Sequence, residues 1–153
     1  MSDLVLREAR REELPAIVRM LADDELGQKR HRVEEPLPGA YYAAFEAIAA
    51  SPNNLLCVAE QNGEIVGTLQ LTFIPGLDYV GAERMLIEAV RVRGERRNAG
   101  IGKAMIARAI EIAQERGCQR VELTSSASRK DAHRFYQRLG FAASHVGMKL
   151  LLK

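Results

Sequence analysis

The sequence lacks the many cysteines that are typical of small secreted proteins and the long apolar runs that are typical of membrane proteins. Its two cysteines, Cys57 and Cys118, show no C-x-x-C spacing and no nearby histidine pair. We therefore expect two small buried thiols in a reducing cytosol, and neither a disulfide nor a metal site. No apolar run approaches the roughly 18 residues of a membrane span, and charge from the third residue onward predicts no secretory signal. These absences predict a cytoplasmic protein with no membrane partner.

An excess of charge of one sign is also absent. Lys and Arg number 22 against 20 Asp and Glu, and the formal charge of +2 is too small to favour a nucleic-acid partner. The 47% hydrophobic and 27% charged residues are ordinary for a globular protein. With 153 residues, no repeats and no linker, the chain predicts a single domain over residues 1–153.

Hydrophobic periodicity changes between the strand and helix patterns along the chain. Asn62 and Gly63 separate two alternating apolar stretches, which favours a two-residue hairpin turn. The patterns predict strands near residues 4–9, 55–61, 64–75, 82–92, 120–126 and 145–153, and helices near residues 11–27, 39–51, 101–117 and 128–141. We therefore expect an α+β fold, with a mixed, mainly antiparallel twisted sheet of about six or seven strands flanked by about four helices.

The stretch "RRNAGIGKAMI" places two glycines in front of a helix. A Walker loop would need a glycine where Arg97 stands and a serine or threonine where Ala104 stands, and a dinucleotide fingerprint would need a third glycine at Met105. What remains is R-x-x-G-x-G, ending at Gly102. Free N–H groups at a helix start favour an anion. An ordinary tight turn with solvated arginines is the alternative.

The two segments "RRNAGIGKAMI" and "RFYQRLGF", in this order and about thirty residues apart, resemble the GNAT superfamily of N-acetyltransferases. The resemblance is strong over residues 84–141, which it implies are the cofactor-binding and catalytic core. It is looser over residues 1–53, implied to be helices on the acceptor side. It implies acetyl transfer from acetyl-CoA to a primary amine of a small molecule or peptide, without a metal, and it allows a homodimer.

The resemblance also implies which residues hold the cofactor. The backbone of the preceding strand would pair with the pantetheine arm at Val90 and Val92, and a strand N–H could serve as oxyanion donor. The diphosphate would lie against Arg97, Asn98, Ala99, Gly100, Ile101, Gly102 and Lys103.

Tyr136 is the candidate general acid for the leaving thiolate. The family places a tyrosine at this point of its second motif, and a phenol with a reference pKa near 10 stays protonated at neutral pH. The alternative is an aromatic side chain packed on its helix. The family often carries an asparagine where Arg129 stands, so hydrogen bonding around the cofactor arm is expected to differ in detail.

Glu88 is the candidate base, through water, because some family members place an acid at this strand position. Strict alternation would put it on one face with Val90 and Val92, where partial burial would raise its pKa. A salt bridge to Arg84 or Arg91, or plain exposure, is the alternative. His133 and Glu122 are weaker candidates.

Residues 23–45 would lie on the acceptor side and mix acidic with aromatic residues, which suits a cationic amine with an apolar body. A solvated charge run beside a packed helix is the alternative, and the basic residues 29–32 argue against a simple funnel for cations. The acceptor is not identified. Two other functions stay open: an acetyl-CoA-binding sensor without turnover, and a DNA-binding regulator suggested only by arginine clusters such as "RVRGERR".

Overall fold

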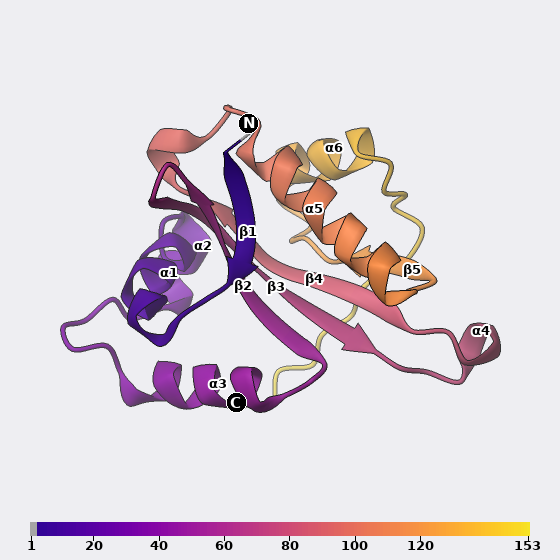
Figure 1. The fold of residues 1–153 in the computed structure, drawn as a ribbon, viewed down its shortest axis with the longest axis horizontal. Coiled ribbons are helices and arrows are strands. Elements are labelled where there is room, and N and C mark those ends of the chain that lie inside the picture. The colour runs from indigo at the N-terminus through magenta and orange to yellow at the C-terminus, as the bar shows by residue number, and fades with distance from the viewer. Residues whose placement is uncertain (1–2) are drawn as a thin grey trace. The chain divides into compact units, whose positions relative to one another are not determined.

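The computed structural model describes residues 3–153. Residues up to Glu122 form one compact unit, and residues from Leu123 onward form a second. The first unit contains most of the sheet and the glycine-rich loop, and the second contains the last helix (Figure 1).

A sheet with the strand order β1-β2-β3-β4-β5 is the framework of the fold. The first four strands pair antiparallel with their neighbours. The N–H of Gln119 donates to the carbonyl of Glu83 at 2.8 Å, which aligns the starts of the last two strands, so β5 runs parallel to β4. The strands are β1 (Leu4–Glu8), β2 (Asn54–Gln61), β3 (Glu64–Ile74), β4 (Arg84–Val92) and β5 (Arg120–Leu123).

The turn between β2 and β3 forms as predicted. Asn62 and Gly63 both have positive φ, 52° and 79°, the left-handed conformation that a two-residue hairpin turn requires. Asn-Gly adopts it more readily than most residue pairs, so the sequence specifies the pairing next to the turn, whereas beyond Glu60 an irregularity shifts the register.

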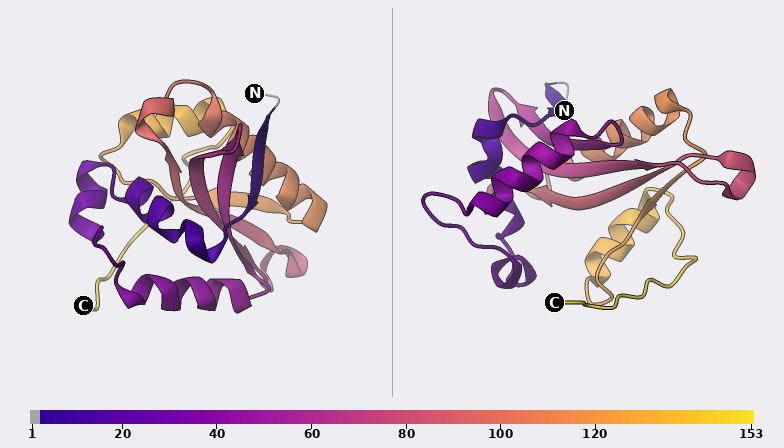
Figure 2. Two further views of the ribbon diagram at one scale, coloured as in Figure 1. Left: turned by 60° about the vertical axis from the view of Figure 1, so that its left-hand side comes forward. Right: turned by 90° about the horizontal axis from the view of Figure 1, so that it is seen from below.

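Three helices cover one face of the sheet, and Figures 1 and 2 show them together on the side away from α5. They are α1 (Leu14–Leu21), which follows the 3-10 turn η1 (Arg11–Glu13), α2 (Glu25–Arg30) and α3 (Gly39–Ala50). In α1 the side chains of Leu14, Ile17 and Val18 are buried, and Leu21 is partly buried. Only two helices were predicted here. The third exists because Asp24 caps α2, its Oδ1 accepting from Gly27 N–H at 2.5 Å.

The other face of the sheet is covered by α5 (Ile101–Arg116). Met105 and Ile106 are fully buried, and a Cβ at Gly67 of β3 would lie 2.5 Å from the Met105 sulfur. Gly67 therefore allows the first turns of α5 to approach the sheet closely. The helix ends before Gly117, where the sequence predicted its end, and the Gly117 φ of 82° forms a left-handed cap.

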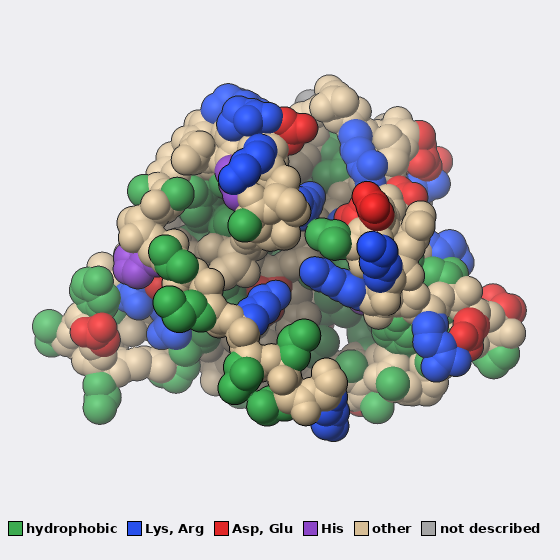
Figure 3. Space-filling model, turned by 180° about the vertical axis from the view of Figure 1, so that it is seen from behind, with side chains coloured by type: hydrophobic (Ala, Val, Ile, Leu, Met, Phe, Trp, Pro, Cys, Tyr) green, Lys and Arg blue, Asp and Glu red, His purple; other side chains and the backbone are tan. Residues whose placement is uncertain are grey.

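The connection from β3 to β4 carries exposed apolar side chains. It contains the short helix α4 (Asp78–Gly81), in which Tyr79 and Val80 have positive φ. Leu77 and Val80 are almost completely exposed, and green side chains stand out at this tip at the left edge of Figure 3.

In the second unit, α6 (Lys130–Arg138) is followed by a chain without regular structure. The helix ends at Arg138 with Leu139 as its C-cap; Gly140, with φ 101°, follows, and Phe141 N–H donates to the Tyr136 carbonyl. The predicted strand near residues 145–153 is wrong, because these residues form no strand and their apolar side chains are exposed. Residues 3–153 thus contain five strands, and six or seven was an overestimate, whereas the α+β class and the mainly antiparallel sheet are confirmed.

Both cysteines are free thiols. Burial raises the pKa of the Cys57 thiol to about 12. Cys118 is half-buried, and its pKa is also raised, mainly by burial and secondly by the Glu83 carboxylate. No helix among residues 3–153 has the length and apolar character needed to cross a bilayer.

Candidate functional site

A β-bulge interrupts β4 immediately before the glycine-rich loop. Gln70 pairs with Glu88 and Thr68 pairs with Arg91, so Leu69 alone faces both Ala89 and Val90. Ala89 has φ 54°, a conformation that costs a non-glycine residue of order 1–3 kcal/mol. A bulge leaves a residue outside the ladder and is common beside active sites. The bulge therefore interrupts the ladder with β3 at the position where the family resemblance implied the pantetheine arm.

The bulge changes which side chains share a face. Directly paired residues point to the same side of an antiparallel sheet. Glu88 and Arg91 therefore share the face of Gln70 and Thr68, which is the side of α1. The expectation that Glu88 shares a face with Val90 and Val92 is wrong, because the extra residue reverses the alternation.

Glu88 is exposed and lacks the partial burial expected of it. Both proposed salt-bridge partners are occupied elsewhere. Arg84 pairs with Glu122 at 3.2 Å, and Arg91 pairs with Asp24 at 3.3 Å. Within residues 3–153 the Glu88 side chain forms no hydrogen bond or ion pair. Of the alternatives at this position, plain exposure is the one observed.

The glycine-rich loop follows β4 through the short turn η2 (Gly94–Arg96) and leads into α5. Asn98 and Gly100 have φ 64° and 79°, and Gly100 is the N-cap of the helix without any side-chain cap. In the part of the chain that the structure describes, the backbone N–H groups of residues 98–103 donate to no protein acceptor. A run of free amides at the positive end of a 16-residue helix favours an anion.

Side chains around this loop add positive charge, although most of it is already paired. Arg97 Nη2 lies 3.3 Å from Asp23, and its Nε donates to the Val92 carbonyl at 3.3 Å. Lys103 is exposed, whereas the Ile101 side chain is buried, so Ile101 presents only its backbone. The predicted cofactor residues of β4 and the loop thus form one continuous stretch of the first unit, from Val90 to Lys103.

A polar cluster that the sequence did not reveal lies beside the bulge. One carboxylate oxygen of Asp24 caps α2 and the other pairs with Arg91. The His31 ring lies 3.1 Å from the Tyr41 hydroxyl. Burial, and then the charges of Arg91 and Arg30, lower the pKa of His31, although Asp24 opposes them, so His31 is neutral near pH 7. These partners are distant in sequence, and no local pattern indicates their contact.

The aromatic residues of α3 mainly serve packing. Tyr41, Tyr42 and Phe45 of α3 pack against the buried cluster that includes Leu14 and Val18. Arg11 stacks on the Tyr42 ring, 4.4 Å from its centroid. Of the two alternatives for this segment, a helix that packs its aromatic side chains describes α3 better than a site for a cationic amine.

Tyr136 lies on α6 in the second unit and is half-buried. Its ring meets Phe135 and Phe141 edge to face, with centroids 5.1 and 5.9 Å away. His133 is fixed locally, its Nε2 lying 2.8 Å from the Ser126 carbonyl. Glu122, the other weak base candidate, pairs with Arg120 at 2.6 Å, and this bond is the main cause of its lowered pKa.

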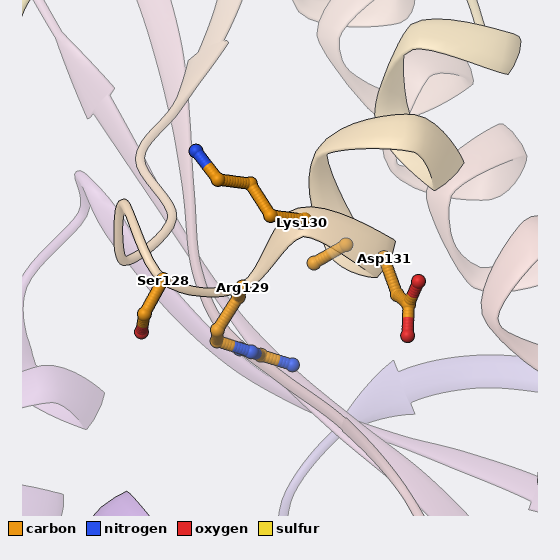
Figure 4. Close-up of a pocket in the computed structure, with 5 residues that line it drawn as sticks. Ser128, Arg129, Lys130 and Asp131 are labelled. Carbon is orange, nitrogen blue, oxygen red and sulfur yellow. The ribbon is translucent and has the colours of Figure 1, made fainter.

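A hollow lies at the start of α6, lined by residues 128–132 (Figure 4). Arg129 is the N-cap residue, and its side chain makes no cap hydrogen bond. No group of three or more His, Cys, Asp or Glu residues that could hold a metal ion occurs in residues 3–153.

The chain matches the acetyltransferase (GNAT) family model over residues 14–141. It is 33% identical over 109 residues to an aminoalkylphosphonate N-acetyltransferase of Salmonella typhimurium, covering 69% of this chain and 68% of that protein. It is 37% identical over 91 residues to a glucosamine 6-phosphate N-acetyltransferase of Trypanosoma brucei brucei, covering 60% of each. The crystal structure of a transcriptional regulator from Bacillus halodurans superposes with a TM-score of 0.94 at 49% identity, covering 97% of this chain and 99% of that one.

Proposed function

Because the chain belongs to the GNAT family of acetyltransferases, we propose that it transfers an acetyl group from acetyl-CoA to a primary amine of a small molecule or peptide. The amine attacks directly in a ternary complex. The observation that carries this proposal is the run of free backbone amides at residues 98–103, at the start of α5. Such amides bind a diphosphate without any side-chain acceptor having to be displaced.

The loop holds the cofactor in this proposal mainly through its backbone. Asn98, Ala99, Gly100, Ile101 and Gly102 present N–H groups to the diphosphate, and the positive end of the helix dipole adds to their attraction. Arg97 and Lys103 supply charge at either end of the loop. Val90 and Val92 pair through their backbone with the pantetheine arm.

The bulge at Ala89 and Val90 positions the thioester. Backbone that has left the ladder can direct an N–H toward the thioester oxygen and stabilise the charge that develops there. Holding thioester and amine together also replaces a bimolecular encounter by a local one, which can supply several kcal/mol.

Two proton transfers complete the reaction. The amine nitrogen forms a bond to the acyl carbon, and the carbon–sulfur bond then breaks. Tyr136 gives its proton to the departing thiolate, and Glu88 takes the amine proton through a water molecule. The exposure of Glu88 supports access to water.

Calorimetry with acetyl-CoA, followed by thiol-release assays over primary amines, tests the proposal. We expect binding with one site per chain and thiol release that depends on an amine. A protein that binds no acetyl-CoA would refute the proposal. Since two curated relatives are named for amines that carry phosphonate or phosphate, the amine set should include such compounds.

A second function is favoured by one comparison. The Bacillus halodurans protein, 49% identical over almost the whole chain, is called a transcriptional regulator. A regulator of this kind would bind acetyl-CoA tightly without acetylating any amine in the set. If it also binds DNA, retention on DNA would fall steeply with salt.

A further inference from the structure

The bulge in β4 places an acidic residue, Glu88, and a basic residue, Arg91, next to each other on the face of the sheet that α1 covers. Glu88 pairs with Gln70, and Arg91 pairs with Thr68, two residues further along β3. Without the extra residue Arg91 would point to the opposite face, toward α5. Positions two residues apart on a strand are separated by about 7 Å. The face therefore presents an acidic and a basic side chain from neighbouring positions of the same sheet face.

Arg91 is placed to take an oxyanion. Its side chain is only 14% exposed, and its Nε already lies 3.3 Å from a carboxylate oxygen of Asp24. Its Nη1 donates to the Val90 carbonyl at 2.9 Å, which fixes the guanidinium against the bulge. A planar, partly buried guanidinium pairs strongly with carboxylate or phosphoryl oxygens. His31, which is neutral, offers a further polar group in the same cluster.

We propose that the acceptor is a short amine carrying a phosphorus oxyanion, and that Arg91 is the residue that selects it. This inference rests on the proposed acetyl transfer. The acceptor amine lies toward Glu88, and the oxyanion takes the place of the Asp24 carboxylate on Arg91. Two relatives are named for amines that carry a phosphorus oxyanion, an aminoalkylphosphonate and glucosamine 6-phosphate; the first name supports a short acceptor.

Three acceptors with the same carbon chain test the proposal: 2-aminoethylphosphonate, 2-aminoethyl phosphate and ethylamine. We expect kcat/KM of the natural protein to be about 10- to 100-fold higher for at least one phosphorus compound than for ethylamine, as one charge-assisted pair would give. The two phosphorus compounds distinguish a phosphonate from a phosphate ester. Equal values for all three acceptors would overturn the proposal.

Arg91→Gln should reduce this preference about 10- to 100-fold, because the amide cannot form the charged pair. Arg11→Gln removes the same charge from a surface pair with Glu46 and should leave the preference unchanged. An Arg91→Gln protein that loses activity equally toward all three acceptors would contradict selection by this residue.

Asp24→Asn tests whether Arg91 selects the acceptor or has only a structural role. It also keeps the proposal testable if the Arg91→Gln protein fails to fold. Asparagine keeps the oxygen that caps α2 but no longer pairs with Arg91. The preference for the phosphorus acceptor should be kept or increased. If Arg91 only ties β4 to the chain before α2, Asp24→Asn should instead lower activity toward all three acceptors. If acetyl-CoA binds but no amine is acetylated, the proposed function itself fails; if ethylamine reacts without any preference, only this inference fails.

Discussion

The guanidinium of Arg97 lies 3.3 Å from the carboxylate of Asp23, which comes from the chain just after α1. Arg97 is one of the residues that we propose for the diphosphate. In the structure Arg97 is paired with an acidic residue, so a diphosphate bound as we propose would share or replace this partner.

Asp23→Asn should tighten acetyl-CoA binding. The pair is about half exposed, so its contribution is small, and we expect a dissociation constant about two- to fivefold lower at low salt, with the gain lost at high salt. Calorimetry at two salt concentrations measures it, with Glu46→Gln as the control. An unchanged constant at low salt would mean that Arg97 does not meet the diphosphate.

Gly102→Asp should abolish acetyl-CoA binding. The side chain adds bulk and a negative charge to the amides at the start of α5, where the diphosphate is proposed to lie. The affinity should fall by at least about 100-fold, as a lost cluster of charge-assisted hydrogen bonds predicts. Gly147→Asp, at an exposed glycine with open space around it, is the matched control. Binding that survives Gly102→Asp would show that the loop has another role.

Tyr136→Phe should lower kcat about 10²- to 10⁴-fold and leave the acetyl-CoA dissociation constant nearly unchanged, since only the proton donor is lost. Edge contacts with Phe135 and Phe141 can persist in the variant, so the fold should be kept. Tyr79→Phe, at the exposed β3–β4 tip, controls for loss of a hydroxyl. Turnover equal to that of the natural protein would remove Tyr136 from the mechanism.

Glu88→Gln should lower the rate with a basic amine at neutral pH by about 100-fold, because a general base of this kind contributes that much. The rate should partly recover at high pH, where the amine is already deprotonated. A pH–rate profile with one amine provides the measurement, and Glu25→Gln, at an exposed position of α2, is the control. A profile of unaltered shape and height would leave Glu88 as a surface residue.

Glu13 links η1 to β1, and its removal should destabilise the protein in a pH-dependent way. Arg7 donates to both carboxylate oxygens at 3.0 and 2.6 Å, and this bond is the main cause of the lowered pKa of Glu13. The carboxylate therefore stabilises the fold above the ordinary glutamate pKa, near 4.3, and this contribution is lost as pH falls through the lower folded value.

Glu13→Gln should lower the free energy of unfolding by roughly 1–3 kcal/mol at pH 7. The difference from the natural protein should shrink as pH falls below about 5. Urea unfolding at several pH values measures it. Glu12→Gln, in the same turn but exposed, should have little effect. A deficit that stays constant down to the lowest pH would contradict this assignment.

Features specified by neighbouring residues could be predicted from the sequence. The Asn62-Gly63 turn and the end of α5 at Gly117 both need left-handed backbone that only a few residues adopt readily. The glycine-rich stretch before α5 was identified for the same reason. In each case a few adjacent residues determine the local conformation.

Features that depend on distant partners could not be predicted. Neither Ala89 nor Val90 marks a bulge, because the extra residue is defined by its pairing with β3. The face of Glu88 was therefore assigned wrongly, and the Arg91–Asp24 contact was not foreseen. Residues 145–153 alternate as a strand does, but alternation describes only one strand, and a strand also needs a partner for its backbone.

The missing side chain at Gly67 has a consequence for how acetyl-CoA affinity could change during evolution or design. Met105 lies in the space that even an alanine methyl would need, and it sits one turn into the helix that begins with the loop. A larger residue at position 67 would push the start of α5 outward and shift the amides of the loop, although no residue that touches the ligand has changed. A substitution in β3 can thus change the affinity for acetyl-CoA without any change in the loop itself.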